Sequence, residues 1–186
     1  MPSPLPISEI LERLETVYGS PVWKPRYDAL SELIYSVLSQ NTSDKNSQPA
    51  FLRLRQAFPR WGLLAQASVE DIAAAIRSGG LAQIKAPRLR EILGQIKRRR
   101  GSLNLDFLKD WPLPEARAWL TTLPGVGPKT AACVLLFSLG RPALPVDTHV
   151  YRVSWRLGLI PREMPREKAH QVLESIVPAV DIYRCH

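Results

Sequence analysis

The stretch LPGVGPKTAACVLLF, residues 123–137, decides the fold. Gly125 and Gly127 bracket a single residue between two apolar segments with helical spacing, and Pro128 stands where the second segment begins. Proline is well tolerated at the first position of a helix, because the N–H that it lacks would have no partner there. The pattern predicts two helices joined by a tight glycine turn, with Lys129 in the first turn of the second helix.

Lys129 occupies a position that does not suit a structural lysine. The N-terminus of a helix carries about half a positive charge, so lysine side chains are favoured at the opposite end. The same charge disfavours the ammonium form of the amine. A neutral lysine amine can attack an electrophilic carbon. The position is therefore poor for a structural lysine and useful for a nucleophile.

The remaining sequence has the period of helices almost throughout. Apolar residues recur every three or four positions and alternating β-branched patterns are nearly absent, which predicts an all-α fold of about nine helices. In the first helix, Ile7, Ile10, Leu11, Leu14 and Val17 share one apolar face. The expected helices lie within 7–19, 27–40, 44–58, 68–80, 87–100, 112–123, 127–140, 146–159 and 165–177.

Helix ends can also be read from the sequence. Ser8, Asp44 and Ser68 are the expected N-caps of three helices, because their side-chain oxygens can accept a bond from a free backbone N–H. Asp147 follows Pro145-Val146 and is expected to cap the helix that begins with THVYRV. Gly19 and Gly79-Gly80 are expected stops.

The charge of the chain favours a polyanionic partner. The 186 residues carry a net charge of +8 and are 45% hydrophobic. Seven basic residues against one acid lie in the run 85–100. A solvated helix face explains that run alone equally well, but together with the charge of the whole chain it indicates nucleic acid.

Several classes of protein are not indicated. No apolar run approaches the roughly 20 residues of a membrane span, and MPSPLPISEI lacks the basic and apolar regions of a signal peptide. The two cysteines, Cys133 and Cys185, do not make a disulfide framework. We expect a protein of a bacterial or archaeal cytoplasm with no membrane partner.

Three segments together resemble one family. TTLPGVGPKTAACVLLFSLGRPALPVDTHVYRV, residues 121–153, resembles the helix-hairpin-helix and the following Gly/Pro-Asp segment of the endonuclease III family of DNA glycosylases. LIYSVLSQNTSDKN (33–46) and GGLAQIKAPRLREI (79–92) resemble two further family segments, in the same order. The resemblance implies a six-helix barrel domain at 26–140, with the helix-hairpin-helix at about 113–139. Residues 1–25 and 141–186 would form a second helical lobe, with DNA in the cleft between.

The resemblance also implies roles for individual residues. Lys129 would be the catalytic lysine and Asp147 the essential aspartate; taken alone, Asp147 reads as a helix cap. Backbone carbonyls of Thr121, Leu123 and Val126 would hold a monovalent cation, K⁺ or Na⁺, that faces a DNA phosphate.

Further residues are implied to contact DNA once the target nucleotide is flipped out of the duplex. Asn41, with Gln40 beside it, would fill the gap, and Leu81 would act as a wedge with Gln83 nearby. A polar helix end explains 39–44 as well, and Asp44 is more readily a cap than a substrate contact. The phosphate contacts are expected from Gly125, Gly127, Thr130 and His149. A purely structural turn would also explain the two glycines, and an ordinary surface histidine would also explain His149.

The expected activity is that of a bifunctional DNA glycosylase and AP lyase on oxidised pyrimidines. Its partner would be double-stranded DNA that carries a damaged base or an abasic site, and the protein is expected to be a monomer. A mismatch (G·T) glycosylase of the same superfamily and a non-catalytic DNA-binding module are the alternatives. Lys129 argues against the adenine-specific branch, which has no lysine there, and Lys129 with Asp147 argues against the non-catalytic module.

This chain departs from the family in one respect. Most members carry a [4Fe–4S] cluster on four C-terminal cysteines, and this chain has only Cys133 and Cys185. We therefore expect no cluster here and a chain truncated before the cluster loop. The lysine chemistry itself requires no cofactor.

Overall fold

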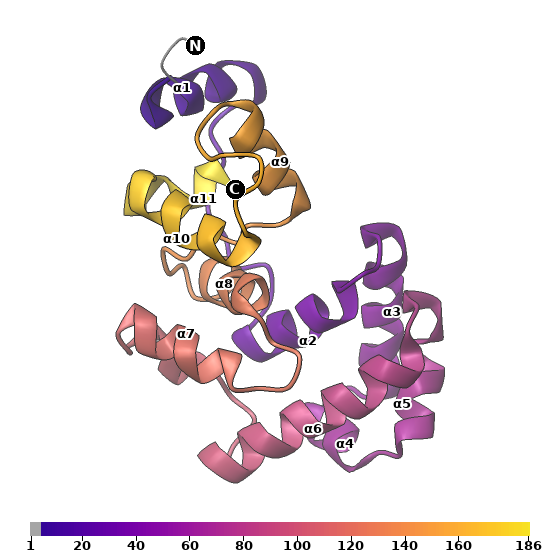
Figure 1. Cartoon of the computed structure of the whole chain (residues 1–186). Coiled ribbons are helices and arrows are strands. Elements are labelled where there is room, and N and C mark those ends of the chain that lie inside the picture. Colours follow the sequence, from indigo (N-terminus) through magenta and orange to yellow (C-terminus); the bar gives the residue numbers. More distant parts are fainter. Residues whose placement is uncertain (1–4) are drawn as a thin grey trace.

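The structure is a computed structural model that describes residues 5–186, so the first four residues of the predicted 1–25 segment lie outside it. Within the described part every secondary-structure element is an α-helix or a 3₁₀ turn and no strand occurs, which confirms the all-α class (Figure 1). The α-helices are α1 (Ile7–Tyr18), α2 (Ala29–Ser39), α3 (Asp44–Ala57), α4 (Trp61–Gln66), α5 (Val69–Ala75), α6 (Ala82–Arg100), α7 (Leu113–Thr121), α8 (Pro128–Phe137), α9 (Thr148–Arg156), α10 (Arg166–Ile176) and α11 (Ile182–Cys185).

The short helices α4 and α11 were not expected, because six and four residues are too few to display a helical period. The start of α6 is also corrected from near Pro87 to Ala82. Gly80 and Leu81 both have positive φ, and this turn allows the helix to begin directly after it.

The cap geometry corrects two of the expected helix ends and confirms two others. Ser43, not Asp44, precedes the first residue of α3, and Pro6 rather than Ser8 precedes α1. Ser68 caps α5 as expected, since its hydroxyl accepts a bond from the N–H of Asp71 at 3.0 Å. Gly19 ends α1 with a positive φ.

Helix α2 lies at the centre of the larger core. It packs against α3, α6 and α8. The apolar residues with helical spacing in 27–40 are all buried, namely Leu30, Leu33, Ile34, Val37 and Leu38. Burial extends beyond this one face, since ten of the eleven residues of α2 are buried.

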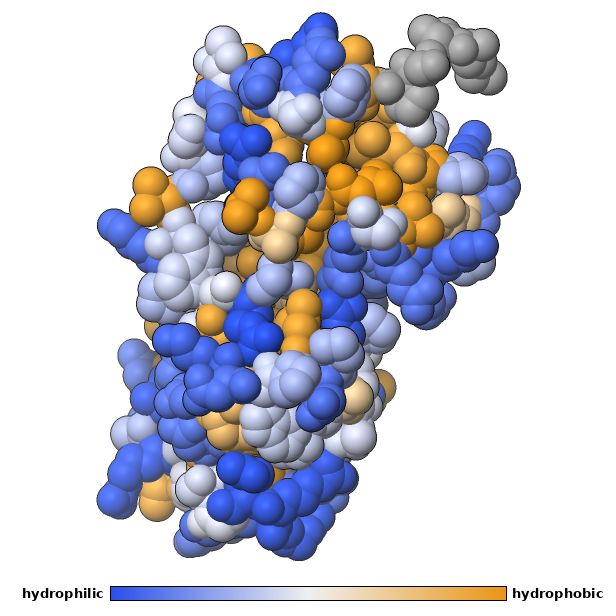
Figure 2. Space-filling view, turned by 90° about the vertical axis from the view of Figure 1, so that its left-hand side faces the viewer, coloured by the Kyte–Doolittle hydropathy of each residue, from blue (hydrophilic) through white to orange (hydrophobic). Residues whose placement is uncertain are grey.

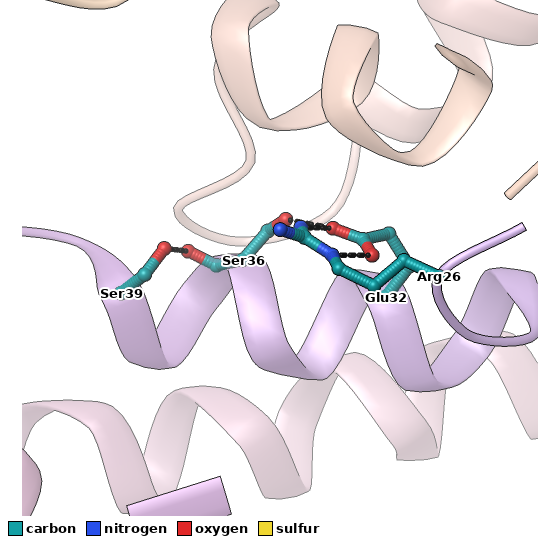
Figure 3. Close-up of polar contacts among 4 residues, drawn as sticks. All are labelled: Arg26, Glu32, Ser36 and Ser39. Carbon is teal, nitrogen blue, oxygen red and sulfur yellow. Dashed lines mark hydrogen bonds and ion pairs between the residues drawn. The ribbon is translucent and has the colours of Figure 1, made fainter. Parts of the chain in front are cut away.

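The buried acid on α2 is neutralised by a residue that precedes the helix. Glu32 is 0% exposed, and the guanidinium of Arg26 pairs with both of its carboxylate oxygens (Figure 3). The hydroxyl of Ser36 donates to the same carboxylate at 3.0 Å. Burying an unpaired carboxylate would be costly, so the pair accounts for an acid at a core position.

Both ends of the chain build a second, smaller lobe. Figure 1 shows α1 beside α9 and α11 at one end of the molecule, away from α3–α6. Arg184 of α11 forms an ion pair with Glu15 of α1 at 3.0 Å. The core of this lobe consists of Leu136, Leu144, Val146, Ile160, Ala169, Leu173, Val177 and Ile182. A second lobe made from both chain ends is therefore confirmed, while the exact boundaries at 26 and 140 stay predictions.

The predicted apolar face of α1 is only partly buried. Ile10 and Leu11 are in the core, but Leu14 and Val17 are 42% and 72% exposed. Figure 2 shows hydrophobic atoms gathered in the upper half of one face, in the lobe that contains α1. Of the five residues that share this apolar face, Ile10 and Leu11 are therefore buried, while Leu14 and Val17 stay exposed.

Polar bonds fix the two lobes to one another. Arg117 of α7 pairs with Glu174 of α10 at 2.6 Å, and Glu174 also accepts a bond from the N–H of Leu144 at 2.7 Å. These bonds hold the lobes on either side of a cleft. Among the described helices, none is both long and apolar enough to cross a membrane.

Candidate active site

A cleft of about 830 Å³ lies where the two lobes meet. Its walls are the end of α2 and the loop after it, the turn between α7 and α8, and the starts of α9 and α10. This volume is in the range of small-molecule pockets. Most of the predicted site residues line it: Gln40, Asn41, Gly125, Gly127, Lys129, Thr130, Asp147 and His149. Leu81 and Gln83 do not, and neither do the predicted cation-binding residues Thr121, Leu123 and Val126.

The two glycines of the hairpin differ in their local surroundings. Gly125 has φ 72°, a conformation that favours glycine, and a Cβ there would lie 2.4 Å from Nε of Arg88 and displace that side chain. Gly127 has an ordinary φ of −90°, and a Cβ would meet nothing within 4 Å. The fold itself therefore does not explain Gly127, whereas close approach of another molecule would.

Asp147 caps α9 with only one of its two carboxylate oxygens. Oδ1 accepts bonds from the N–H groups of His149 and Val150, each at 2.8 Å. No hydrogen bond from the described residues reaches Oδ2. The predicted cap is confirmed, and the second oxygen remains available at the cleft.

Lys129 lies in the first turn of α8 and is half-buried in the cleft wall. No carboxylate in residues 5–186 forms an ion pair with it. Cys133 lies one turn further on, where burial raises the pKa of its thiol and the charge of Lys129 opposes that rise. The amine of Lys129 is thus not paired with an acid, and it lies beside the cleft that Asp147 also lines.

Gln40 holds the hairpin in place. Its amide Nε2 donates to the carbonyl of Gly125 at 2.9 Å and to the hydroxyl of Thr130 at 3.1 Å. Its Oε1 accepts a bond from Arg88 Nη1 at 3.0 Å. These bonds give Gln40 a positioning role beside Lys129, and its contact with DNA stays a prediction.

The two residues predicted to enter the duplex share an unusual backbone. Asn41 and Leu81, with φ 52° and 54°, are the only non-glycine residues with positive φ in the described chain. Asparagine tolerates this conformation, but leucine rarely adopts it. Leu81 is 48% exposed at the start of α6, and Gln83 is exposed nearby.

The sequence did not indicate the wall formed by α10. Arg166, Glu167 and His170 line the cleft there. His170 is buried, and its Nδ1 lies 3.1 Å from the carbonyl of Leu144. Because a carbonyl only accepts, Nδ1 must carry the proton. A single histidine in an amphipathic helix carries no signal that would have identified it.

Burial lowers the pKa of His170 below its ordinary value of 6.5. The unfolded chain then binds more protons than the folded one as pH falls through 6.5, so the free energy of unfolding should decrease there. In His170→Gln the amide can still donate to Leu144, but it does not titrate. Denaturant unfolding at pH 7.5 and pH 5.5 should show a larger loss for the wild type than for the variant. Equal losses would contradict this.

The hairpin offers carbonyl oxygens to the predicted monovalent cation. The carbonyl of Leu123 accepts a bond from the N–H of Val126 at 3.1 Å, which leaves a second lone pair. Thr121 ends α7, so its carbonyl stands at the free end of a helix. The carbonyls of Leu123 and Thr121 can thus each accept a further contact, and the cation itself stays a prediction.

The cysteines do not fit an iron–sulfur cluster. Cys133 is buried within α8 and Cys185 lies in α11 of the other lobe. In the part of the chain that the structure describes, no three His, Cys, Asp or Glu side chains are grouped to hold a metal. A cluster needs four thiolates, which these residues cannot provide.

Comparison with known proteins gives the family. Residues 34–179 match the model of the HhH-GPD superfamily base excision DNA repair protein. This chain belongs to that family. An endonuclease III of Thermotoga maritima is 36% identical over 151 residues, which are 81% of this chain and 66% of that protein. A provisionally named DNA glycosylase of Arabidopsis thaliana is 40% identical over 149 residues, or 80% of this chain and 51% of that protein.

The chain thus spans about half to two thirds of the length of these relatives. Among solved structures, a non-covalent endonuclease III–DNA complex matches with a TM-score of 0.79 and 27% identity, over 97% of this chain and 80% of the other. A thermostable thymine-DNA glycosylase has the same fold at 20% identity and a TM-score of 0.72, over 96% of this chain and 79% of the other. The fold alone therefore does not determine which damaged base is removed.

Proposed function

We propose that this chain is a bifunctional DNA glycosylase and AP lyase that removes oxidised pyrimidines from double-stranded DNA. The observation that carries the proposal is the pairing of Lys129 and Asp147 on one cleft, with the lysine free of an acid partner and one aspartate oxygen free of the helix cap. Membership of the base excision repair family supports the proposal. The protein would act as a monomer.

Lys129 would act as the nucleophile. Its amine attacks C1′ of the damaged nucleotide, the base leaves with the electrons of the glycosidic bond, and loss of a proton from nitrogen with ring opening gives a Schiff base. Abstraction of a C2′ proton then expels the 3′ phosphate by β-elimination and breaks the strand. The N-terminus of α8 and the exclusion of water by DNA would favour the neutral amine.

Asp147 would assist through its free oxygen. Oδ1 is fixed by two backbone N–H groups, so the direction of the carboxylate is set before substrate arrives. Oδ2 can then stabilise positive charge that develops on the sugar, or take a proton from the amine.

Borohydride trapping tests this proposal and its alternatives. The substrates are duplexes that carry an abasic site, thymine glycol or a G·T mismatch. We expect covalent adducts with the abasic site and thymine glycol. An adduct with the mismatch but not with thymine glycol would favour the mismatch glycosylase. Binding of DNA without any covalent adduct would favour the non-catalytic DNA-binding module.

Binding should depend strongly on salt and little on sequence, since a basic surface and helix N–H groups contact phosphates rather than bases. Fluorescence anisotropy with an undamaged duplex at increasing salt should give a steep fall of log affinity against log salt. A flat plot would contradict a phosphate-based interface.

Replacing Gly127 by alanine should weaken DNA binding without a loss of stability. A Cβ there meets open space within the protein but would stand between the hairpin and a phosphate. Gly62→Ala is the matched control, because its Cβ also meets nothing within 4 Å and it lies in α4, away from the cleft. Anisotropy titration should separate the two variants. Equal affinity would show that Gly127 does not approach DNA.

A further inference from the structure

A buried lysine joins the two loops that carry the strained residues. Lys85 of α6 is only 2% exposed. Its ammonium donates to the carbonyl of Leu38 at 2.5 Å, to the hydroxyl of Thr42 at 2.7 Å and to the carbonyl of Gly79 at 3.1 Å. An ammonium has three N–H donors, so all three are used. None of the acceptors is a carboxylate.

These acceptors stand on both sides of the strained residues. Leu38 and Thr42 flank the turn at Asn41, while Gly79 precedes the turn at Leu81. The hydroxyl of Thr42 also donates to the carbonyl of Gly79 at 2.7 Å, which links the loops directly. One ammonium and one hydroxyl therefore connect two loops that are about forty residues apart in sequence.

The close packing of these loops supports the same conclusion. A Cβ on Gly79 would lie 2.9 Å from Cβ of Ala50 on α3, so this loop cannot shift towards α3. Positive φ strains the backbone of a leucine and persists only where the surroundings impose it. The hydrogen bonds from Lys85 and Thr42 are the polar contacts that connect the two turns at Asn41 and Leu81.

We propose that Lys85 is a positioning residue that braces the loops of Asn41 and Leu81 against each other, so that both side chains enter the DNA stack as one rigid unit. The proposal rests on the proposed function, because it gives the two residues their role in DNA. Pushing a base out of a duplex breaks its stacking and pairing, and loose loops would yield before the base stack does.

A buried positive charge without an acid partner is poorly explained by stability alone. Burial lowers the pKa of Lys85, and the charge of Arg88 lowers it further, so the charged form is disfavoured in the folded protein. Methionine has nearly the same length and would avoid that cost. Only the lysine, however, can bind three oxygens from two loops with a single atom.

The test compares Lys85→Met with Trp61→Phe. The control also removes a buried bond from the same lobe, Trp61 Nε1 to Ser31 Oγ at 3.2 Å, but does not touch either loop. The probe is a duplex in which 2-aminopurine faces a tetrahydrofuran abasic analogue, because its fluorescence rises on unstacking and needs no catalysis. At saturating protein we expect a clearly smaller rise for Lys85→Met than for the wild type and the control.

Two further measurements distinguish the loss of the brace from general damage to the protein. Excision of thymine glycol from a duplex should slow about 10- to 100-fold in Lys85→Met, as expected when reacting groups are misplaced. Cleavage of an abasic site in single-stranded DNA, which has no stack to enter, should be nearly unchanged. If Lys85→Met does not fold, Thr42→Val removes one arm of the brace, and Thr42→Ser should restore it.

The outcomes are distinct. Equal slowing on duplex and single strand, or an unchanged fluorescence rise in both Lys85→Met and Thr42→Val, would overturn the brace. A wild type that gives no rise would overturn it as well. A wild type that gives the rise but excises nothing, with a smaller rise in Lys85→Met, would support the brace and reject the proposed glycosylase activity.

Discussion

Replacing Lys129 by glutamine should abolish strand cleavage and borohydride trapping. Glutamine keeps the length and polarity of the side chain but has no nucleophilic amine, so no Schiff base can form. DNA binding should remain largely intact, because one charge among many phosphate contacts contributes little to affinity. Gel assays of cleavage at an abasic site, with anisotropy on the same duplex, measure the two properties separately.

Lys168→Gln provides the matched control. It removes the same charge from an exposed lysine on α10 and should cleave as the wild type does. A Lys129→Gln protein that still formed a covalent adduct would reject Lys129 as the nucleophile.

Replacing Asp147 by asparagine should slow base excision by at least about 100-fold, the loss typical of a positioned acid–base group. Asparagine caps a helix about as well as aspartate, and its amide oxygen can keep the two backbone bonds of Oδ1. The amide NH₂ that replaces Oδ2 can neither balance positive charge nor accept a proton. Single-turnover excision of thymine glycol and thermal melting should show a slow but stable protein.

Asp147→Ala separates the cap from the chemistry. It removes both, so it should lose about 0.5–2 kcal/mol of stability in addition to the rate. At an abasic site Asp147→Asn should be less affected, because Lys129 attacks there without expelling a base. If Asp147→Asn excised damaged bases at the wild-type rate, the aspartate would be a cap alone.

The sequence was most informative where function and local structure coincide. The hairpin, the start of α8 at Pro128 and the cap at Asp147 all depend on neighbouring residues, so their patterns could be read directly. The all-α class followed from the helical period in the same way. The second lobe followed from the resemblance rather than from the period.

Long-range contacts could not be read in this manner. Nothing near Gln40 in the sequence indicates that its amide reaches Gly125, 85 residues away, or that Arg88 meets it there. Nothing in the sequence indicates that Glu32 is buried, because its partner Arg26 lies in the segment before the helix. Lys85 was counted as part of a basic run, although burial sets it apart from the other basic residues of that run.

Peptide mapping of the borohydride-trapped complex tests the central claim most directly. The wild-type protein is reduced on a duplex that carries an abasic site, the adduct is digested with protease and nuclease, and mass spectrometry locates the sugar remnant. The account predicts a single modified residue, Lys129. A remnant on any other amine, or no covalent complex from protein that binds the duplex, would contradict it.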